Sequence, residues 1–380
     1  MKLFECQHCG QPLYFENTRC ESCGRQLGYL PSKETVSALE EIKDGWRALA
    51  DPAGGRYRYC ANIKYEACNW LLAADSPHQF CEACRHNRMI PDLSLYENAA
   101  NWRKIETAKH RLFYTLLKFR LPLSTRTEDE TGGLAFDFLA VPQPNSHSVM
   151  TGHAGGLITI SLSEANDSER ERQRRQMGEP YRTLLGHFRH EIAHYYWDQL
   201  VKNSPSLEEF RQLFGDERQD YVAALQKHYA EGPPANWSER FVTAYASVHP
   251  WEDFAETWAH YFHIVDTLET ANAFGMRVRP RLSMGADLAT AVDFDPHTAT
   301  MERIIDSWLP LTFAVNSINR SMGIADLYPF VFGPAVIVKL SFIHQRIHSQ
   351  PGVRSLDQGD GTLRAVIAGL KRVVGAPEPT

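Results

Sequence analysis

The stretch HFRHEIAHYYWD, residues 187–198, places His190 and His194 four residues apart, with Glu191 directly after the first histidine. We expect one helix over 181–201, because it contains no proline and Gly186 is its only weak helix former. On a helix, side chains at i and i+4 lie one above the other, so both imidazoles can reach a single metal ion. Glu191 lies about 100° further round the helix, beside that ion. The stretch therefore predicts two metal ligands and a neighbouring carboxylate that can act as a general base on water.

A catalytic zinc takes three protein ligands, and this stretch supplies two of them. The continuation YYWD, residues 195–198, lacks the glycine turn and the third histidine of the metzincin pattern, which excludes that class. His187 lies one turn before His190 on the same face, and we expect it to be packed or to support the site without binding metal. The third ligand must therefore come from elsewhere in the chain.

The stretch HPWEDFAETWAHYFHIVD, residues 249–266, predicts a second helix that starts at Pro250. Its candidate ligands lie on or near one face: Glu252, Asp253, Glu256 and His260. Glu256 is favoured, since a carboxylate three residues before it and a histidine four after it can orient a metal ligand. Glu252 is the first alternative, followed by Asp253 or His260. A donor to the oxyanion is also expected, and either Tyr245 or His249 can provide it.

The first four cysteines, Cys6, Cys9, Cys20 and Cys23, form two CxxCG units. Each unit is typical of a zinc knuckle, in which the turn aims backbone N–H groups at sulfur and the glycine supplies a positive φ. About thirty residues bury too little apolar surface to fold unaided, so a metal has to contribute to folding. Four unrelated thiols and a rubredoxin-like iron site are the weaker alternatives to this zinc ribbon.

The remaining cysteines, Cys60, Cys68, Cys81 and Cys84, predict a second structural zinc site. CEAC is again CxxC, but seven residues separate the cysteines of the first pair, which is a less specific spacing. The alternative is a set of buried free thiols. His78 and His86 flank this module, and either can replace one thiol as a ligand.

Composition limits the classes of protein. The 380 residues carry a net charge of -6, with a pI near 6.2, so there is no large positive field for a nucleic-acid backbone. The basic run at 170–175 is interleaved with glutamate and is typical of a solvated helix face. We expect no membrane span and no signal peptide, hence a cytoplasmic protein whose cysteines bind metal in preference to forming disulfides.

The pattern along the chain predicts a mainly α, α+β protein. We expect a zinc ribbon over 1–31, a second four-cysteine zinc module over 56–95, and a catalytic domain over 96–380 with a helical C-terminal part. Residues 31–49 are interpreted as a short helix or linker that ends at DPAGG. The segment 93–119 predicts a long amphipathic helix, and a small sheet is expected near 134–163.

The chain resembles the bacterial zinc-binding metallopeptidases with an N-terminal zinc ribbon, within the zincin-like superfamily. The resemblance rests on the two CxxCG units, CNWL...FCEACRHNRMIPDLS, YRTLLGHFRHEIAHYYWD and HPWEDFAETWAHY, and it covers most of 1–270. It implies a gluzincin-type peptidase domain with His190, His194 and Glu256 on zinc and Glu191 as the base. It thereby supports Glu256 over Glu252.

These observations predict a zinc metallopeptidase that hydrolyses peptide or amide bonds in a peptide or protein substrate. They imply one catalytic and two structural Zn²⁺ ions, with no nucleic-acid or membrane partner, and they leave the oligomeric state open. The rival hypothesis is a noncatalytic, zinc-stabilised adapter whose ribbon binds a protein partner. An intact Glu191 argues against the adapter, because a structural zinc site does not need it.

Overall fold

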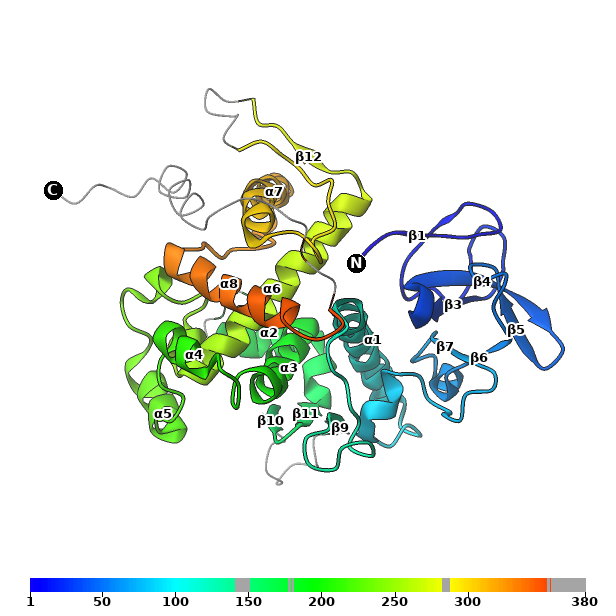
Figure 1. The fold of residues 1–380 in the computed structure, drawn as a ribbon, viewed down its shortest axis with the longest axis horizontal. Helices are drawn as coiled ribbons and strands as arrows, with labels where there is room; N and C mark the ends of the chain where they lie inside the picture. Colours follow the sequence, from blue (N-terminus) through cyan, green and yellow to red (C-terminus); the bar gives the residue numbers. More distant parts are fainter. Residues whose placement is uncertain (141–150, 177–178, 180, 282–287, 354–355, 357–380) are drawn as a thin grey trace. The chain divides into compact units, whose positions relative to one another are not determined.

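The structure is a computed structural model that describes the chain except for residues 141–150, 177–178, 180, 282–287, 354–355 and 357–380. Its contacts divide the chain into two compact units, Met1–Tyr195 and Tyr196–Thr380. Figure 1 shows the first unit in blue to green and the second in green to red. Within the described residues, no helix combines the length and the apolar character that crossing a membrane requires.

The first unit begins with two small sheets. Strands β1 (Phe4–Glu5) and β2 (Pro12–Leu13) form a hairpin. An antiparallel sheet of five strands follows, in the order β3 (Leu27–Leu30), β4 (Thr35–Ile42), β5 (Gly45–Ala48), β6 (Tyr57–Tyr59) and β7 (Leu71–Ala73). Leu30, Leu39, Ala48, Tyr57 and Leu71 form a buried cluster of this sheet. The sheet therefore joins the chain segments that carry the two cysteine modules.

The expected helix or linker over 31–49 is wrong, because most of this segment forms the hairpin of β4 and β5. Ile42 pairs with Gly45, so the loop has two residues, and Asp44 adopts a φ of 63°. An Asp-Gly pair at such a loop is a strong hairpin signal. The helix-forming residues of the segment misled the prediction, because pairing with β3 on one side and β5 on the other outweighs local helix propensity.

A third sheet in this unit carries the segment before the histidine motif. Its strands lie in the order β10 (Gly152–Ala154), β11 (Leu157–Ser161), β9 (Ala135–Leu139) and β8 (Asn87–Met89). Strand β9 is parallel to both β11 and β8, and β10 is antiparallel to β11. The expected small sheet near 134–163 is therefore present, with β8 as an additional strand.

The first unit also contains α1 (Tyr96–Phe119), α2 (Asp167–Gln176) and the greater part of α3 (Leu184–Leu200). Helix α1 confirms the amphipathic pattern, and Phe113 packs against Phe136 of the sheet at 6.0 Å between ring centroids. Phe188 of α3 packs against Phe136 and Phe138 at 5.8 and 6.3 Å. The sheet therefore supports both α1 and the helix that carries the histidine motif, which starts three residues later than expected.

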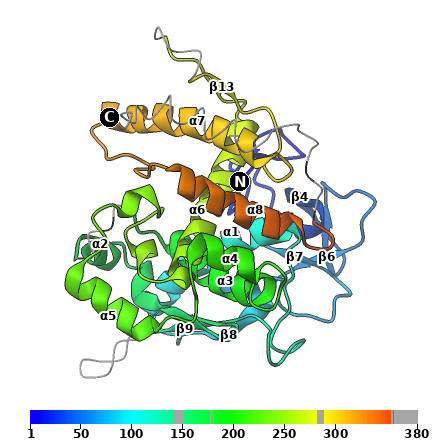
Figure 2. The same ribbon diagram turned by 60° about the vertical axis from the view of Figure 1, so that its left-hand side comes forward.

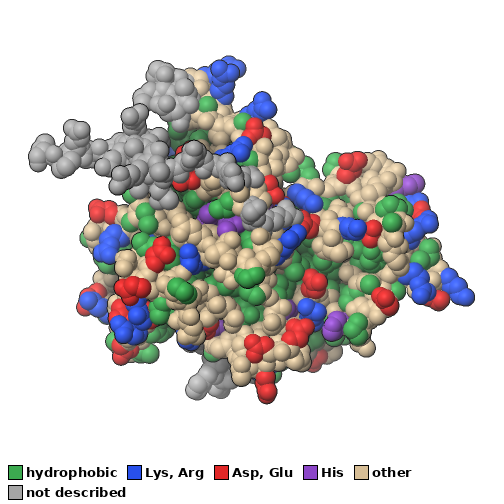
Figure 3. Space-filling view, viewed as in Figure 1, with side chains coloured by type: hydrophobic (Ala, Val, Ile, Leu, Met, Phe, Trp, Pro, Cys, Tyr) green, Lys and Arg blue, Asp and Glu red, His purple; other side chains and the backbone are tan. Residues whose placement is uncertain are grey.

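Helix α2 carries the basic run of the sequence. Arg172 pairs with Glu169, and Arg174 pairs with Glu171, each within the helix. The expected solvated face is confirmed, because these side chains are exposed or half-buried. Among the described residues on the face drawn in Figure 3, basic and acidic side chains are likewise interspersed.

The second unit is helical: α4 (Leu207–Phe214), α5 (Tyr221–Glu231), α6 (Pro250–Ala273), α7 (Met301–Ser321) and α8 (Pro334–His348), with a hairpin of β12 (Arg277–Val278) and β13 (Thr290–Ala291). Helix α6 starts at the proline, as expected, and most of its residues are buried. Figure 2 shows α8 beside α6, where the Tyr261 hydroxyl lies 2.8 Å from His344 Nδ1. The end of α3 also belongs to this unit, and its Tyr196 stacks on Trp258 of α6 at 5.1 Å.

Short 3-10 helices connect these elements. They span Pro31–Lys33, Ala61–Tyr65, Cys84–His86, Leu162–Ala165, Trp237–Glu239 and Tyr245–Ser247. The second and third of them each begin at or next to a cysteine of the second module. The last of them directly precedes α6 and contains Tyr245.

Candidate metal centres

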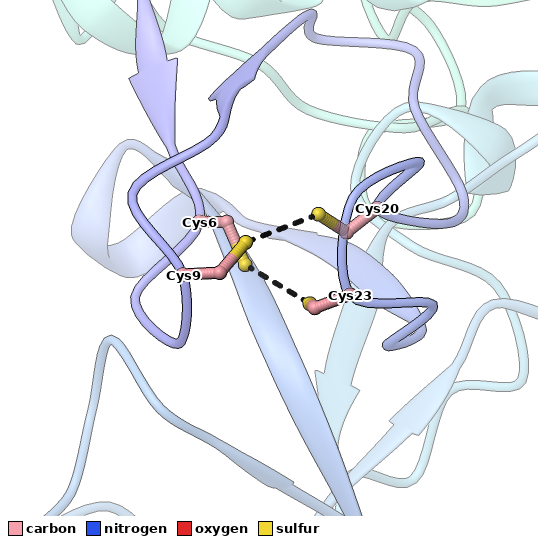
Figure 4. A group of neighbouring side chains, drawn as sticks. All are labelled: Cys6, Cys9, Cys20 and Cys23. Atoms are coloured by element: carbon pink, nitrogen blue, oxygen red, sulfur yellow. Dashed lines mark hydrogen bonds between the residues drawn. The ribbon is translucent and has the colours of Figure 1, made fainter.

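The first cysteine module consists of two loops of the same shape. Gly10 N donates to Cys6 O at 2.9 Å, and Gly24 N donates to Cys20 O at 2.8 Å. The two glycines have φ of 73° and 74°, as the knuckle pattern predicted. Figure 4 shows Cys6 and Cys9 on one loop facing Cys20 and Cys23 on the other.

The sulfur positions in this module suit zinc. Cys6 Sγ lies 3.7 Å from Cys23 Sγ, and Cys9 Sγ lies 3.6 Å from Cys20 Sγ. A tetrahedral site with Zn–S bonds of about 2.3 Å has sulfur atoms about 3.8 Å apart. Since each cysteine offers a sulfur within 4.8 Å of the other three, the four thiols can hold one ion.

The second module brings together the four cysteines that the sequence analysis grouped: Cys60, Cys68, Cys81 and Cys84. All four are buried, and Cys68 Sγ lies 3.7 Å from Cys81 Sγ. Backbone N–H groups point at the sulfurs, from Cys81 N to Cys60 Sγ at 3.3 Å and from Trp70 N to Cys68 Sγ at 3.4 Å. This hydrogen bonding suits metal-bound thiolates, because N–H groups stabilise the charge on sulfur.

The histidines that flank this module are not among the grouped donors of the described residues. His86 is buried, and its Nδ1–H donates to Leu134 O at 3.0 Å. His78 is exposed. The histidine that does lie at the thiols is His110 of α1, which was predicted only as part of an amphipathic helix. The polar residues on the buried face of that helix, Glu106, Lys109 and His110, were the signal that was missed.

The histidine motif of α3 brings two ring nitrogens together. His190 Nε2 and His194 Nε2 lie 3.2 Å apart, with the ring planes at 83° to each other. Two nitrogens on a tetrahedral zinc with Zn–N bonds of about 2.0 Å lie about 3.3 Å apart, so the pair suits one ion. Glu191 is 8% exposed and His194 is 3% exposed, which places them in a largely water-excluded environment.

His187 has a different contact from the two histidines that follow it. Its Nδ1 lies 3.1 Å from Glu164 Oε2, and Arg182 reaches Glu164 Oε1 at 3.1 Å. Burial opposes the charge of Glu164, but His187 and Arg182 outweigh it and hold the pKa of this carboxyl at about 2. These contacts support the interpretation that His187 is a packed, supporting residue.

In the second unit, each candidate ligand at the start of α6 has its own neighbour. Tyr221 donates to Glu252 Oε1 at 2.9 Å, and Thr243 donates to Glu256 Oε2 at 2.7 Å. Lys339 Nζ donates to Asp253 Oδ2 at 2.6 Å, and His260 Nδ1 contacts the Tyr328 hydroxyl. Glu252 is 2% exposed and Glu256 is half-buried. Asp253 therefore forms a buried ion pair with Lys339, which makes it a weaker candidate for a metal ligand.

The two candidate oxyanion donors also belong to this unit. His249 caps α6, because its Nδ1 accepts from Trp251 N at 3.1 Å, and its Nε2–H donates to Gln219 O at 3.2 Å. Both nitrogens of His249 are thus engaged within the second unit. Burial, together with Glu252 and Tyr221, raises the pKa of Tyr245 far above its usual range. Tyr245 therefore keeps its hydroxyl proton and can donate it in a hydrogen bond.

Comparison with known proteins identifies two zinc-related families. A family profile described as "putative zinc-binding metallo-peptidase" matches residues 98–346, and one described as a zinc-ribbon domain matches residues 3–95. Uncharacterized proteins from Mycobacterium bovis and Mycobacterium tuberculosis are 40% identical over 355 residues, covering 90% of this chain and 94% of theirs. No solved structure matches the chain.

The peptidase match spans well over half of the chain, and its residues include the histidine motif and α6. The chain belongs to the zinc-binding metallopeptidase family of that profile, with a zinc-ribbon domain in front of the peptidase region. The resemblance noted from the sequence motifs is thereby confirmed.

Proposed function

We propose that this protein is a zinc-dependent peptidase of the gluzincin type with a zincin-like catalytic domain, which hydrolyses peptide or amide bonds. The observation that carries the proposal is the pair of nitrogens on His190 and His194, 3.2 Å apart on a helix that also carries the largely buried Glu191. A structural site closes its coordination with four protein ligands, whereas a glutamate beside two histidines provides a base for water.

The third ligand in this proposal is a carboxylate of α6. Helix α3 is continuous through both histidines, and its Tyr196 stacks on Trp258 of α6 in the second unit. Glu252 and Glu256 lie on α6 within two turns of Trp258, since a turn is about 3.6 residues. We propose that a carboxylate from one of these two positions completes the coordination of the metal on α3.

We favour Glu252, in place of Glu256, which the sequence pattern favoured. Glu252 is 2% exposed, and burying a carboxylate is costly unless a cation compensates its charge, which zinc does. The hydroxyl of Tyr221 holds its Oε1 and so limits rotation of the carboxylate. Glu256 is half-buried and accepts from Thr243, so water and a hydroxyl can satisfy it.

Each residue then has a role in hydrolysis. A zinc ion held by His190, His194 and the carboxylate of α6 would lower the pKa of bound water toward neutrality and would polarise the carbonyl of the scissile bond. Glu191 takes a proton from the attacking water, whose oxygen bonds to the carbonyl carbon. As the C–N bond breaks, Glu191 delivers the proton to the leaving amine. Tyr245 donates to the oxyanion, a role for which His249 is less suited because its ring nitrogens cap α6 and bond Gln219.

Digestion of a peptide library, read by mass spectrometry, tests the activity. We expect cleavage by the wild type and a loss of about 10²- to 10⁴-fold in Glu191→Gln at unchanged zinc content, since general acid–base catalysis contributes this much. Glu209→Gln, an exposed glutamate on α4, is the matched control and should cleave normally. Equal cleavage by wild type and Glu191→Gln, or no cleavage by a wild type that retains its zinc, contradicts the proposal and favours the adapter.

Zinc content tests the third ligand separately. The proposal expects three zinc ions per chain, two in the cysteine modules and one on the histidines. Glu252→Gln should lower the content by one, and Glu256→Gln should leave it unchanged. The reverse result restores Glu256 as the ligand, and three ions in both variants show that neither glutamate is the third ligand.

A further inference from the structure

A histidine of α1 lies against the second cysteine module. His110 Nε2 is 3.5 Å from Cys84 Sγ and 3.9 Å from Cys81 Sγ. Its Nδ1 lies 2.6 Å from the backbone oxygen of Glu106, which can only accept, so Nδ1 carries a hydrogen and donates it. The ring also packs against Trp70, with centroids 5.2 Å apart. Since His110 is 4% exposed, these contacts fix its Nε2 toward the two sulfurs.

A buried ion pair lies next to this histidine on the same helix. Lys109 Nζ donates to Glu106 Oε1 at 2.8 Å and also to Asn87 Oδ1. Glu106 and Lys109 are fully buried, so each charge compensates the other. Cys84, Glu106 and His110 lie close enough to hold an ion of their own. Because Lys109 already neutralises Glu106, this trio is better explained as the surroundings of the four-thiol site.

We propose that His110 is a positioning residue of the second metal site, whose Nε2–H donates to the sulfurs of Cys84 and Cys81 and fastens α1 to the module. Four thiolates and one divalent ion leave two net negative charges in a buried site. A hydrogen bond from the ring to a thiolate sulfur is charge-assisted, and such hydrogen bonds are among the strongest. Such contacts behind the ligands hold their geometry and strengthen metal binding.

The consequence is a link between the two family regions of the first unit. The zinc-ribbon match ends at residue 95 and the peptidase match begins at residue 98, just inside α1. Metal in the second module therefore orders the first helix of the peptidase region through His110. Tyr114, one turn later on α1, packs against Phe15 of the ribbon at 5.4 Å, which extends the same contact. This role is independent of whether the protein cleaves peptides.

The test uses the full chain with cadmium-113 in place of zinc, because each four-thiolate site then gives its own NMR resonance. Cys9→Ser assigns the first-module resonance by its loss. His110→Phe keeps a ring and removes the N–H groups, so it should shift the second-module resonance and weaken metal binding there by about 10- to 100-fold in chelator competition. His110→Leu, which is smaller and also lacks N–H groups, serves if the phenylalanine does not fit.

The matched control is His86→Phe, another buried ring of the same unit, whose Nδ1–H donates to Leu134 O and not to a thiol. It should leave the second-module resonance and affinity unchanged. An unchanged resonance and affinity in the His110 variants overturns the proposal, as does an equal change in His86→Phe. Loss of one metal ion from Glu106→Gln, with the second-module resonance unchanged, would identify a separate ion at the trio and also overturns it.

Discussion

The two four-cysteine modules hold the same set of ligands, but the first is partly exposed and the second is fully buried. In the first module, Cys9 is exposed and Cys23 is half-buried, and the two knuckles are built from local turns with Gly10 and Gly24. In the second module all four cysteines are buried, and α1 covers them with His110. The first site therefore carries its geometry in a few neighbouring residues, whereas the second depends on packing with distant ones.

The largest expected effect is on folding, when one cysteine ligand is removed from either module. We expect Cys68→Ser to prevent folding of the first unit, because apparent zinc-binding free energies of about 10–16 kcal/mol exceed the stability of most domains. Cys9→Ser should loosen only residues 1–24. Hydrogen exchange read by mass spectrometry on the full chain measures both. Protection of α1 that survives in Cys68→Ser would show that the second module does not support the peptidase region.

An intermediate effect concerns the order of metal release. A chelator should remove zinc from the first module at least about tenfold faster than from the second, since the buried site has the additional contacts that commonly change metal affinity 10- to 100-fold. Time-resolved zinc release with a colour indicator, compared between wild type and Cys9→Ser, assigns the fast phase. A fast phase of undiminished amplitude in Cys9→Ser contradicts the contrast between the modules.

The smallest expected effect concerns backbone conformation. Gly10→Ala should destabilise the first module by about 1 kcal/mol, because an L-residue with a side chain resists the left-handed region that a φ of 73° requires. In the second module, Glu66 holds a φ of 57°, so Glu66→Gly should be neutral or slightly stabilising. Chemical denaturation of the full chain gives both values. A stabilising Gly10→Ala would show that the knuckle does not need its glycine.

The same contrast explains what the sequence could predict. The CxxCG pattern specifies both the spacing of the ligands and the geometry of the turn, so the first metal site could be predicted from neighbouring residues. The wide spacing between Cys60 and Cys68 contains neither, and His110 joins that module only through packing across the unit. The 3.6-residue period predicted α1, α6 and the helix of the histidine motif, because burial of one face is a local property of a helix.

Local sequence patterns failed where strand pairing decides the secondary structure or where side-chain contacts decide which carboxylate can bind metal. Helix propensity over 31–49 favoured the wrong element, although Asp44-Gly45 was a hairpin signal within it. On α6, spacing could place four polar residues on or near one face but could not show that Lys339 occupies Asp253 or that Tyr221 holds Glu252. The choice of the third ligand therefore needs the partners of each carboxylate.

Hydrolysis in water labelled with oxygen-18 tests the proposed activity most directly. Wild-type protein with all its zinc is incubated with a peptide pool in the labelled water, and the new C-termini are analysed by mass spectrometry beside Glu191→Gln of equal zinc content. We expect one labelled oxygen in each new carboxylate from the wild type and no labelled products above background from the variant. No labelled product from zinc-loaded wild type, or the same labelled products from both proteins, would contradict the assignment of the helix of His190, Glu191 and His194 as a hydrolytic zinc centre.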